Sequence, residues 1–435
     1  MSGPTTVLII AWSLAGFAYA QDSSRVYVLD RIIVEGNSIT KPYVITRELP
    51  FKQHDTVSSA KIEEGRKKLV DTGLFTDVLT QNEPVGGDTI DLLIYVREKW
   101  YIWPYPVAGF RDRDWSKFYA GAGAVDLNFR GAAERLAFAF ALGYDPFVGV
   151  IYRNPAVGND KRYLFGIGGS YSRGSNFGLE SGFSNGEYND DFGSIYIEGG
   201  RRLGEHVTAT AQLGYNYVGA NSTEYSGLVV SPTGKDIFSS LKLRYVYDDR
   251  DFISYASSGM RTDIEYEKFG LGESQVNFAR FAFDLRNYFE VISPIVAAVR
   301  IHGNLAEGPV IPPYDLVYYG YYERIRGMFN DTLVGESLAG ANVEIRIPLI
   351  KELVINFPFE ILKQYISNRI GIYWTFFGDA GETSGKSLEM SLHRLVYGYG
   401  GGLSLALPYN IVIQADYARG SDGHWEFILD FGETI

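Results

Sequence analysis

The stretch Leu136–Leu142, with the sequence LAFAFAL, alternates large apolar side chains with alanines. Successive side chains of a β-strand point to opposite faces of the sheet, so the leucines and phenylalanines share one face. The same period of two recurs in Leu241–Tyr247 (LKLRYVY), where the second face is mostly charged. This pattern predicts strands with one apolar face and one small or polar face.

Segments of this kind repeat from Trp100 to the end of the chain, and helical periodicity is absent there. About sixteen can be counted, and many reach the ~9–11 residues that a tilted strand needs to cross a bilayer. We therefore predict an all-β transmembrane barrel of about sixteen antiparallel strands over residues 100–435, with a soluble double barrel as the alternative. The expected strands begin near Tyr101, Lys117, Ala133, Phe147, Lys161, Phe192, His206, Asp236, Gly259, Ser274, Pro294, Leu338, Asn368, Arg394, Asn410 and His424.

Composition is consistent with such a barrel and excludes several other classes of protein. Charged residues make up 21% of the 435 residues and apolar residues 46%, so the chain is neither disordered nor a helical membrane protein. The 32 tyrosines and 49 glycines suit strands that meet membrane interfaces and turn often. A net charge of −12 argues against a nucleic-acid partner, and the lack of cysteine excludes disulfides and thiolate zinc sites.

The first twenty residues have the pattern of a signal peptide. Val7–Phe17 is an apolar run too short to span a membrane as a mature helix, and Ala18-Tyr19-Ala20 has the small-x-small pattern of a cleavage site. We therefore predict a signal peptide over residues 1–20. No later stretch reaches the ~18 uninterrupted apolar residues of a membrane helix.

Residues 25–99 differ from the segments that follow, because they combine helical and strand patterns. A helix over Ser59–Leu69 should end at Gly73, where a C-cap glycine belongs. The order strand, helix, helix, strand, strand predicts a small α+β domain. The other elements are expected at Val26–Glu35, Lys41–Leu49, Asp77–Gln81 and Thr89–Glu98.

Residues in the arrangements used by enzymes or metal sites are missing. The five histidines are scattered without a ligand spacing, and Gly335-Glu336-Ser337 lacks the second glycine of a nucleophile elbow. We predict that the chain is not an enzyme and that it holds no metal or cofactor.

One ordered set of motifs points to a known family. Ile325-Arg326-Gly327-Met328 lies in the long connection between Leu305 and Leu338, and is followed by Leu338–Pro348 and by Phe376–Gly381 (FFGDAG). This set resembles the BamA/TamA superfamily of outer-membrane assembly and secretion barrels, in which an arginine-glycine loop precedes a strand with an inward Glu and an F-x-D-x-G strand. Met328 stands where the family has an aromatic residue.

Residues 25–99 are similar to a single POTRA domain of that family. Ile33–Asn37 (IVEGN) and Asp71–Phe75 (DTGLF) stand where the characteristic segments of that module fall. The resemblance therefore covers nearly the whole chain after the predicted signal peptide.

The resemblance implies that Arg326 is tucked into the barrel lumen. Alternation puts Glu344 and Asp379 on inward faces of consecutive strands, so the planar guanidinium could engage both carboxylates. Gly327 would let the loop backbone pass close to the barrel wall. The alternative is that Glu344 pairs locally with Arg346.

The function implied is outer-membrane protein biogenesis or protein translocation, in a Gram-negative bacterium and with the POTRA domain in the periplasm. Its partners would be outer-membrane lipid, unfolded or extended client proteins captured by strand addition, and accessory proteins of the periplasm or inner membrane. The alternative function is a passive outer-membrane pore or surface antigen with the same architecture.

The first expected strand contains Pro104 and Pro106, which have no N–H to donate. We therefore predict a weak seam between this strand and the last strand, which ends near Phe431. Prolines also protect sheet edges from unwanted pairing, and this segment could instead be a linker before the barrel.

Overall fold

In the computed structural model, the described part of the chain forms two compact units, of residues 26–37 with 48–97 and of residues 38–47 with the chain from 98 onward. The predicted signal peptide, residues 1–20, lies outside the described residues. The described ranges are 26–110, 115–157, 161–175, 189–220, 229–251, 255–272, 275–320, 323–328, 333–354, 369–385, 394–407 and 411–431.

The first unit is a four-stranded sheet with a helix. The sheet order is β2-β1-β4-β3, and β1 and β4 run parallel. Ser58 caps the helix by accepting the backbone N–H of Lys61, and Gly73 follows the helix end with φ of 73°. The elements are β1 (Val26–Glu35), β2 (Thr56–Ser58), α2 (Ser59–Asp71), β3 (Phe75–Gly86) and β4 (Thr89–Glu98).

This unit differs from the expected α+β order in two ways: it contains β2, whose three residues are too few to reveal an alternation, and it lacks the first of the two expected helices. The segment 38–47, with the short helix α1 (Pro42–Thr46), belongs to the second compact unit rather than the first. There the backbone N–H groups of Ile39 and Thr40 donate to the Glu98 carboxylate at 2.9 and 2.5 Å. Burial disfavours the charged carboxylate, but these bonds and those from side chains hold the pKa of Glu98 below its usual value.

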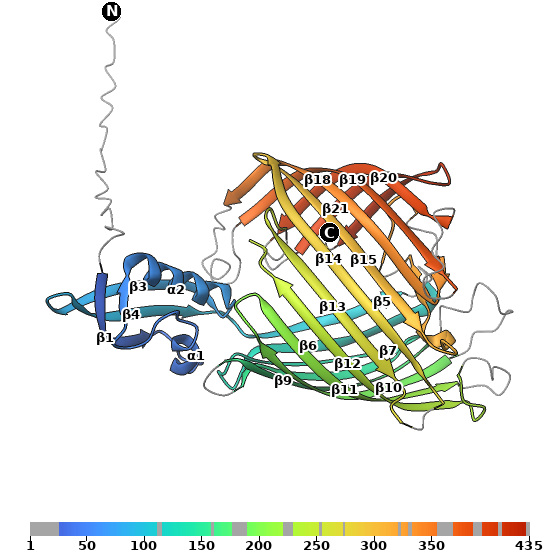
Figure 1. The fold of residues 1–435 in the computed structure, drawn as a ribbon, viewed down its shortest axis with the longest axis horizontal. Coiled ribbons are helices and arrows are strands. Elements are labelled where there is room, and N and C mark those ends of the chain that lie inside the picture. The colour runs from blue at the N-terminus through green and yellow to red at the C-terminus, as the bar shows by residue number, and fades with distance from the viewer. Residues whose placement is uncertain are drawn as a thin grey trace, which may run out of the picture. The chain divides into compact units, whose positions relative to one another are not determined.

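The second unit is a sixteen-stranded antiparallel sheet that curves into a barrel of tilted strands (Figure 1). The sheet order follows the chain from β5 at one end to β22 at the other, interrupted only by β16 (Val317–Tyr319) and β17 (Leu333–Gly335), which form their own ribbon. The strands are β5 (Ile102–Phe110), β6 (Phe118–Phe129), β7 (Glu134–Gly143), β8 (Phe147–Val157), β9 (Tyr163–Ser175), β10 (Asn189–Arg202), β11 (Val207–Ala220), β12 (Lys235–Asp248), β13 (Gly259–Phe269), β14 (Phe278–Ile292), β15 (Ile295–Glu307), β18 (Ser337–Val354), β19 (Arg369–Ser384), β20 (Val396–Leu407), β21 (Ile411–Gly420) and β22 (Trp425–Phe431).

This confirms the predicted fold class. Each of the sixteen expected strands is present, and the largest error in a starting position is at Ser274, four residues before β14 begins at Phe278. Among the described residues, no helix is long and apolar enough to cross a membrane.

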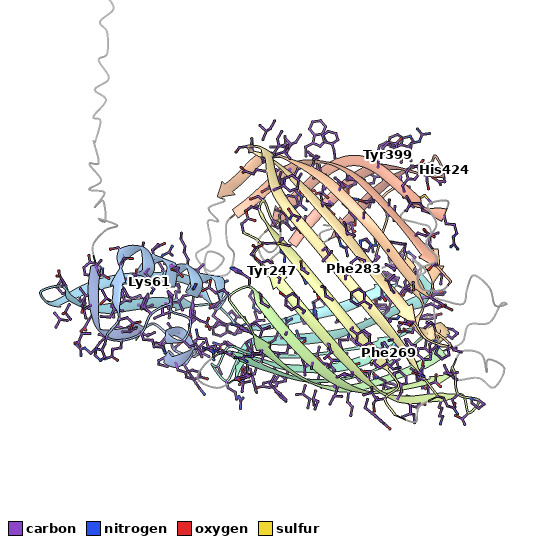
Figure 2. All side chains as sticks on the ribbon, viewed as in Figure 1. Lys61, Tyr247, Phe269, Phe283, Tyr399 and His424 are labelled. Atoms are coloured by element: carbon purple, nitrogen blue, oxygen red, sulfur yellow. The ribbon has the colours of Figure 1, made fainter. Side chains whose placement is uncertain are left out.

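The two faces of the sheet differ in the way that a lipid-embedded barrel requires. On β7, Phe138 and Leu142 are 45% and 66% exposed on the outer face. Tyr399 of β20 likewise lies at the outer surface of the barrel (Figure 2). The inner face carries buried charged side chains, among them Arg280, Arg300, Arg346, Glu344, Asp379 and Asp416. An apolar exterior around a polar lumen is the inverse of a soluble barrel.

The connections at the two ends of the barrel differ in length. At the end where the chain enters β5, here called the entry end, most turns are short, as at 130–133, 203–206 and 293–294. The opposite end carries the longest connection, residues 308–336 between β15 and β18. We call this connection the lumen loop.

Candidate functional site

The lumen loop brings Arg326 into the barrel on a tight turn. The backbone N–H of Met328 donates to the carbonyl oxygen of Ile325 at 3.0 Å, which closes a β-turn over residues 325–328. Gly327 has φ of 95° at the third position, as a type II turn requires. The turn leaves the Arg326 side chain pointing at the wall formed by β18 and β19.

Arg326 forms a two-pronged ion pair with Asp379. Its Nε and Nη2 donate to the two carboxylate oxygens at 2.7 and 2.8 Å, and its backbone N–H donates to Oδ2 at 3.1 Å. Its Nη1 donates to Oε2 of Glu344 at 3.1 Å. The guanidinium carbon also lies 3.7 Å from the centre of the Phe377 ring, a cation–π contact. Arg326 is only 3% exposed, so these contacts replace its water shell.

Glu344 accepts hydrogen bonds from two arginines at once. Its Oε2 accepts from Arg326, and its Oε1 accepts from Nε of Arg346 at 2.9 Å. The local pairing and the loop pairing, posed above as alternatives, therefore occur together. Asp416 of β21 is a third carboxylate, 3.8 Å from Nη1 of Arg326 and 1% exposed. Asp416 could not be identified from the sequence, because only the register of β19, β20 and β21 brings it to this point.

Three glycines let the loop backbone touch the barrel wall. A Cβ atom on Gly398 of β20 would lie 1.8 Å from the carbonyl oxygen of Arg326. A Cβ on Gly420, opposite Gly398 on β21, would lie 2.1 Å from the carbonyl oxygen of Gly327. A Cβ on Gly327 would in turn meet the backbone of Arg419 at 2.7 Å. Any larger residue at these positions would hold the loop away from the wall.

Apolar and charged contacts also hold other described residues of the loop. Tyr319 and Ile325, each 2% exposed, pack against Leu338 of β18, and Met328 packs at the edge of this cluster. Glu323 accepts two hydrogen bonds from Arg300 of β15, at 2.8 and 3.0 Å. The loop is thus held at several points besides Arg326.

A turn from the entry end reaches the same site from the other side. It connects β12 and β13, and its Ala256 carbonyl oxygen accepts from Nη1 of Arg346 at 3.1 Å. The Tyr255 ring lies under the Arg346 guanidinium at 3.9 Å, and its hydroxyl is 3.5 Å from Oε1 of Glu344. Glu344 thus joins segments from both ends of the barrel. Nothing in the sequence pattern singled out Tyr255.

Pro104 and Pro106 lie on β5, the strand at one end of the sheet order. Leu127 of β6 donates to the carbonyl oxygen of Tyr101 at 3.0 Å, and the β5–β6 register is unbroken from Ile102 to Phe110. Odd-numbered residues of β5 therefore exchange hydrogen bonds with β6. The nitrogens of both prolines point to the opposite edge. Phe431 is the last residue of β22, the other terminal strand, and pairs with Ile413.

Other chemistry is not evident in the described part of the chain, where no group of three or more His, Asp or Glu side chains could hold a metal ion.

A sixteen-stranded barrel that holds an arginine-bearing loop in its lumen, with a small α+β domain before it, defines a class of transmembrane barrel with a POTRA module. The Omp85 superfamily domain matches residues 128–434, and the chain belongs to this superfamily. A POTRA profile, described as a surface antigen variable number repeat, matches residues 27–99.

Two curated relatives are both named outer membrane protein assembly factor BamA. The protein from Nitratidesulfovibrio vulgaris is 23% identical over 349 residues, which cover 74% of this chain and 41% of that protein. The protein from Neorickettsia risticii is 27% identical over 77 residues, 18% of this chain and 10% of that protein. The chain therefore spans less than half the length of the curated relatives that it matches.

Solved structures share the fold at low sequence identity. BamA from Haemophilus ducreyi lacking POTRA domains 1–3 has a TM-score of 0.60 and 16% identity, over 93% of this chain and 83% of that one. CdiB from Acinetobacter baumannii has a TM-score of 0.55 and 15% identity, over 94% and 73%. CdiB from Escherichia coli has a TM-score of 0.61 and 10% identity, over 93% and 74%.

Proposed function

We propose that this protein inserts or transports client polypeptides at the outer membrane of a Gram-negative bacterium. The observation that carries the proposal is the buried pairing of Arg326 with Asp379 and Glu344, which holds the loop inside an Omp85-type barrel. Both curated relatives are named as assembly factors, which supports the same activity.

Occupancy of the lumen argues against the alternative of a passive pore. Ile325, Arg326 and Tyr319 of the lumen loop are each at most 3% exposed, and Tyr255 enters from the entry end. A water-filled channel needs an unobstructed lumen, whereas here side chains from both ends meet at Glu344. A barrel that holds segments from both ends against its inner wall at this point is better suited to handling clients at the wall than to passive flow.

We infer that the wall opens between β5 and β22. A lipid-facing sheet must pair nearly all of its backbone groups, because there is no water in the hydrocarbon to replace a missing partner. Pro104 and Pro106 remove two donors from the edge of β5 that faces away from β6. Each missing hydrogen bond would weaken a β5–β22 ladder by about 0.5–1.5 kcal/mol.

The POTRA domain would supply the client in an extended form. In its sheet, β3 is a terminal strand of 12 residues, so one edge is available to a client segment. An extended polypeptide can add to such an edge through main-chain hydrogen bonds with little sequence preference. The domain lies in the periplasm in this proposal.

A disulfide across the seam tests the opening directly. The chain has no cysteine of its own, so two can be introduced without background. Tyr105 and Ile428 both face the lumen, and Ile428 packs there with Phe377 and Ala418. Tyr105→Cys combined with Ile428→Cys, or with Glu426→Cys one step along the same face, is expected to lose activity on oxidation and regain it on reduction.

Leu429 provides the matched control, because it is 56% exposed on the outer face. Tyr105→Cys with Leu429→Cys should stay unlinked and active under the same oxidation. Full activity in a locked lumen-side pair would show that clients do not pass between β5 and β22.

Depletion of the protein tests the function as a whole. If it assembles or secretes clients, quantitative proteomics of outer-membrane and culture fractions should show specific polypeptides lost within a few generations. An unchanged proteome, together with altered uptake of small solutes, would favour the passive pore.

A further inference from the structure

A short segment of residues 38–41, here called the strap, ties the start of β5 to the turn between β6 and β7. These residues lie between β1 and β2 in the chain but belong to the same compact unit as the barrel. The Glu98 carboxylate holds one side of the strap, where it accepts the backbone N–H groups of Ser38, Ile39 and Thr40 at 3.0, 2.9 and 2.5 Å.

The Thr40 hydroxyl is the centre of the contact. It lies 2.9 Å from the hydroxyl of Tyr101, the residue before β5, and it accepts from Nδ2 of Asn128 at 2.8 Å. Oδ1 of Asn128 accepts in turn from the backbone N–H of Ala133 at 2.7 Å. Thr40, Tyr101 and Asn128 are 1%, 5% and 2% exposed. Water therefore cannot replace a missing partner unless the contact itself opens.

The β6–β7 turn is shaped to receive the strap. Arg130 and Gly131 have φ of 58° and 70°, and positive φ at both central residues is what a type I′ turn requires. The backbone N–H of Lys41 donates to the carbonyl oxygen of Gly131 at 2.9 Å. A Cβ atom on Gly131 would lie 2.0 Å from the carbonyl oxygen of Ile39, so a larger residue would push the strap off the turn.

Strand β5 needs such a contact because it ends the sheet order and has one weak edge. Pro104 and Pro106 remove donors from the edge that faces away from β6, so β5 depends on its ladder with β6. A terminal strand frays from its end unless a tertiary contact fixes that end. The ladder begins with the hydrogen bond from Leu127 to Tyr101, and Tyr101 is the residue that Thr40 contacts.

We propose that Thr40 is a positioning residue for β5, which keeps the entry end of this strand paired with β6 while the opposite edge of β5 opens. Its contacts with Tyr101 and Asn128 join the start of β5 and the β6–β7 turn into one sector of the barrel. An opening towards β22 then leaves the β5–β6 pair intact. This role rests on the proposed opening, but the contact can be tested without any client.

Amide hydrogen exchange of the full chain in detergent micelles, measured by mass spectrometry, tests the contact. Thr40→Val is close to threonine in shape but has no hydroxyl. It is expected to speed exchange about tenfold in the peptides that contain Trp103 and Leu127, which belong to the β5–β6 ladder. Exchange in β14 and β15 should not change. Thr40→Ser keeps the hydroxyl and should return the ladder towards the wild-type rate.

Two further variants separate the contact from a general effect of substitution. Tyr101→Phe removes the other hydroxyl, and its effect should not add to that of Thr40→Val, because the two residues share one hydrogen bond. Thr46→Val is the matched control in the same segment. The Thr46 hydroxyl donates locally to the carbonyl oxygen of Tyr43 at 3.5 Å, so its loss should leave exchange in β5 unchanged.

Unchanged exchange at Trp103 and Leu127 in the Thr40→Val variant would overturn the proposal. An equal rise in β14 and β15 would overturn it too, because it would mean a general loss of barrel stability rather than a release of β5. Failure of Thr40→Ser to slow the exchange again would show that the hydroxyl is not the cause. None of these measurements uses transport activity, so their failure is distinguishable from failure of the proposed function.

Discussion

Replacing Arg326 with alanine is expected to abolish activity and to destabilise the barrel by about 3–5 kcal/mol. The substitution leaves Asp379 and Glu344 buried without their shared guanidinium. The Phe377 ring would also lose its cationic partner. Arg326→Lys keeps the charge but cannot donate to both oxygens of Asp379 and to Glu344 in one plane, so it should restore stability in part and activity poorly.

Arg324→Ala is the matched control in the same loop. Arg324 pairs with Asp430 at 2.8 Å, but the two side chains are 33% and 31% exposed, so water screens the interaction. We expect a loss of at most about 1 kcal/mol and little change in activity. Urea titration of the heat-dependent gel shift gives the stability, and complementation of a depleted strain gives the activity. Equal losses for the Arg324 and Arg326 variants would contradict a special role for the buried site.

Gly398→Ala is expected to expel the loop while every charged residue of the site remains. The new Cβ would lie 1.8 Å from the carbonyl oxygen of Arg326, a distance that backbone atoms cannot accommodate without moving. Displacing that backbone separates Arg326 from Asp379, so activity should fall about as far as in Arg326→Ala. In the double variant the two losses should not add, because both remove the same anchor.

A single cysteine at Met328 reports the loop position in this experiment. Met328→Cys should react slowly with a bulky maleimide in the wild-type background and much faster beside Gly398→Ala. Gly378→Ala is the control, since Gly378 adjoins Asp379 on β19 but an added Cβ there would meet nothing within 4 Å. Slow labelling in the Gly398→Ala variant would mean that the wall tolerates the methyl group and that the glycine contact does not hold the loop.

The alternation in stretches such as Leu136–Leu142, together with the length of the segments, was enough to predict a barrel over residues 100–435 and the start of each strand to within four residues. Side chains along a strand alternate between the two faces of the sheet. This alternation can be recognised from the residues of each strand alone. The short strand β2 was not predicted, because three residues cannot show a period. The placement of segment 38–47 in the same compact unit as the barrel was not predicted either, because it depends on tertiary contacts rather than on composition.

The candidate site was determined by the sequence only in part. The motif around Arg326 and the inward faces of Glu344 and Asp379 could be inferred from one strand at a time and from the family resemblance. Their spacing of two residues puts the nitrogens of Pro104 and Pro106 on one edge of β5, but only the hydrogen bond from Leu127 to Tyr101 decided which edge.

Tertiary structure alone decided the remaining contacts. Asp416 approaches Arg326, Tyr255 approaches Arg346, and Gly398 receives the loop backbone because of the register between strands and the path of two connections. A residue's face follows from its neighbours in the chain. Its height along the barrel, and hence its partner across the lumen, follows from the hydrogen-bond register of all the strands between them.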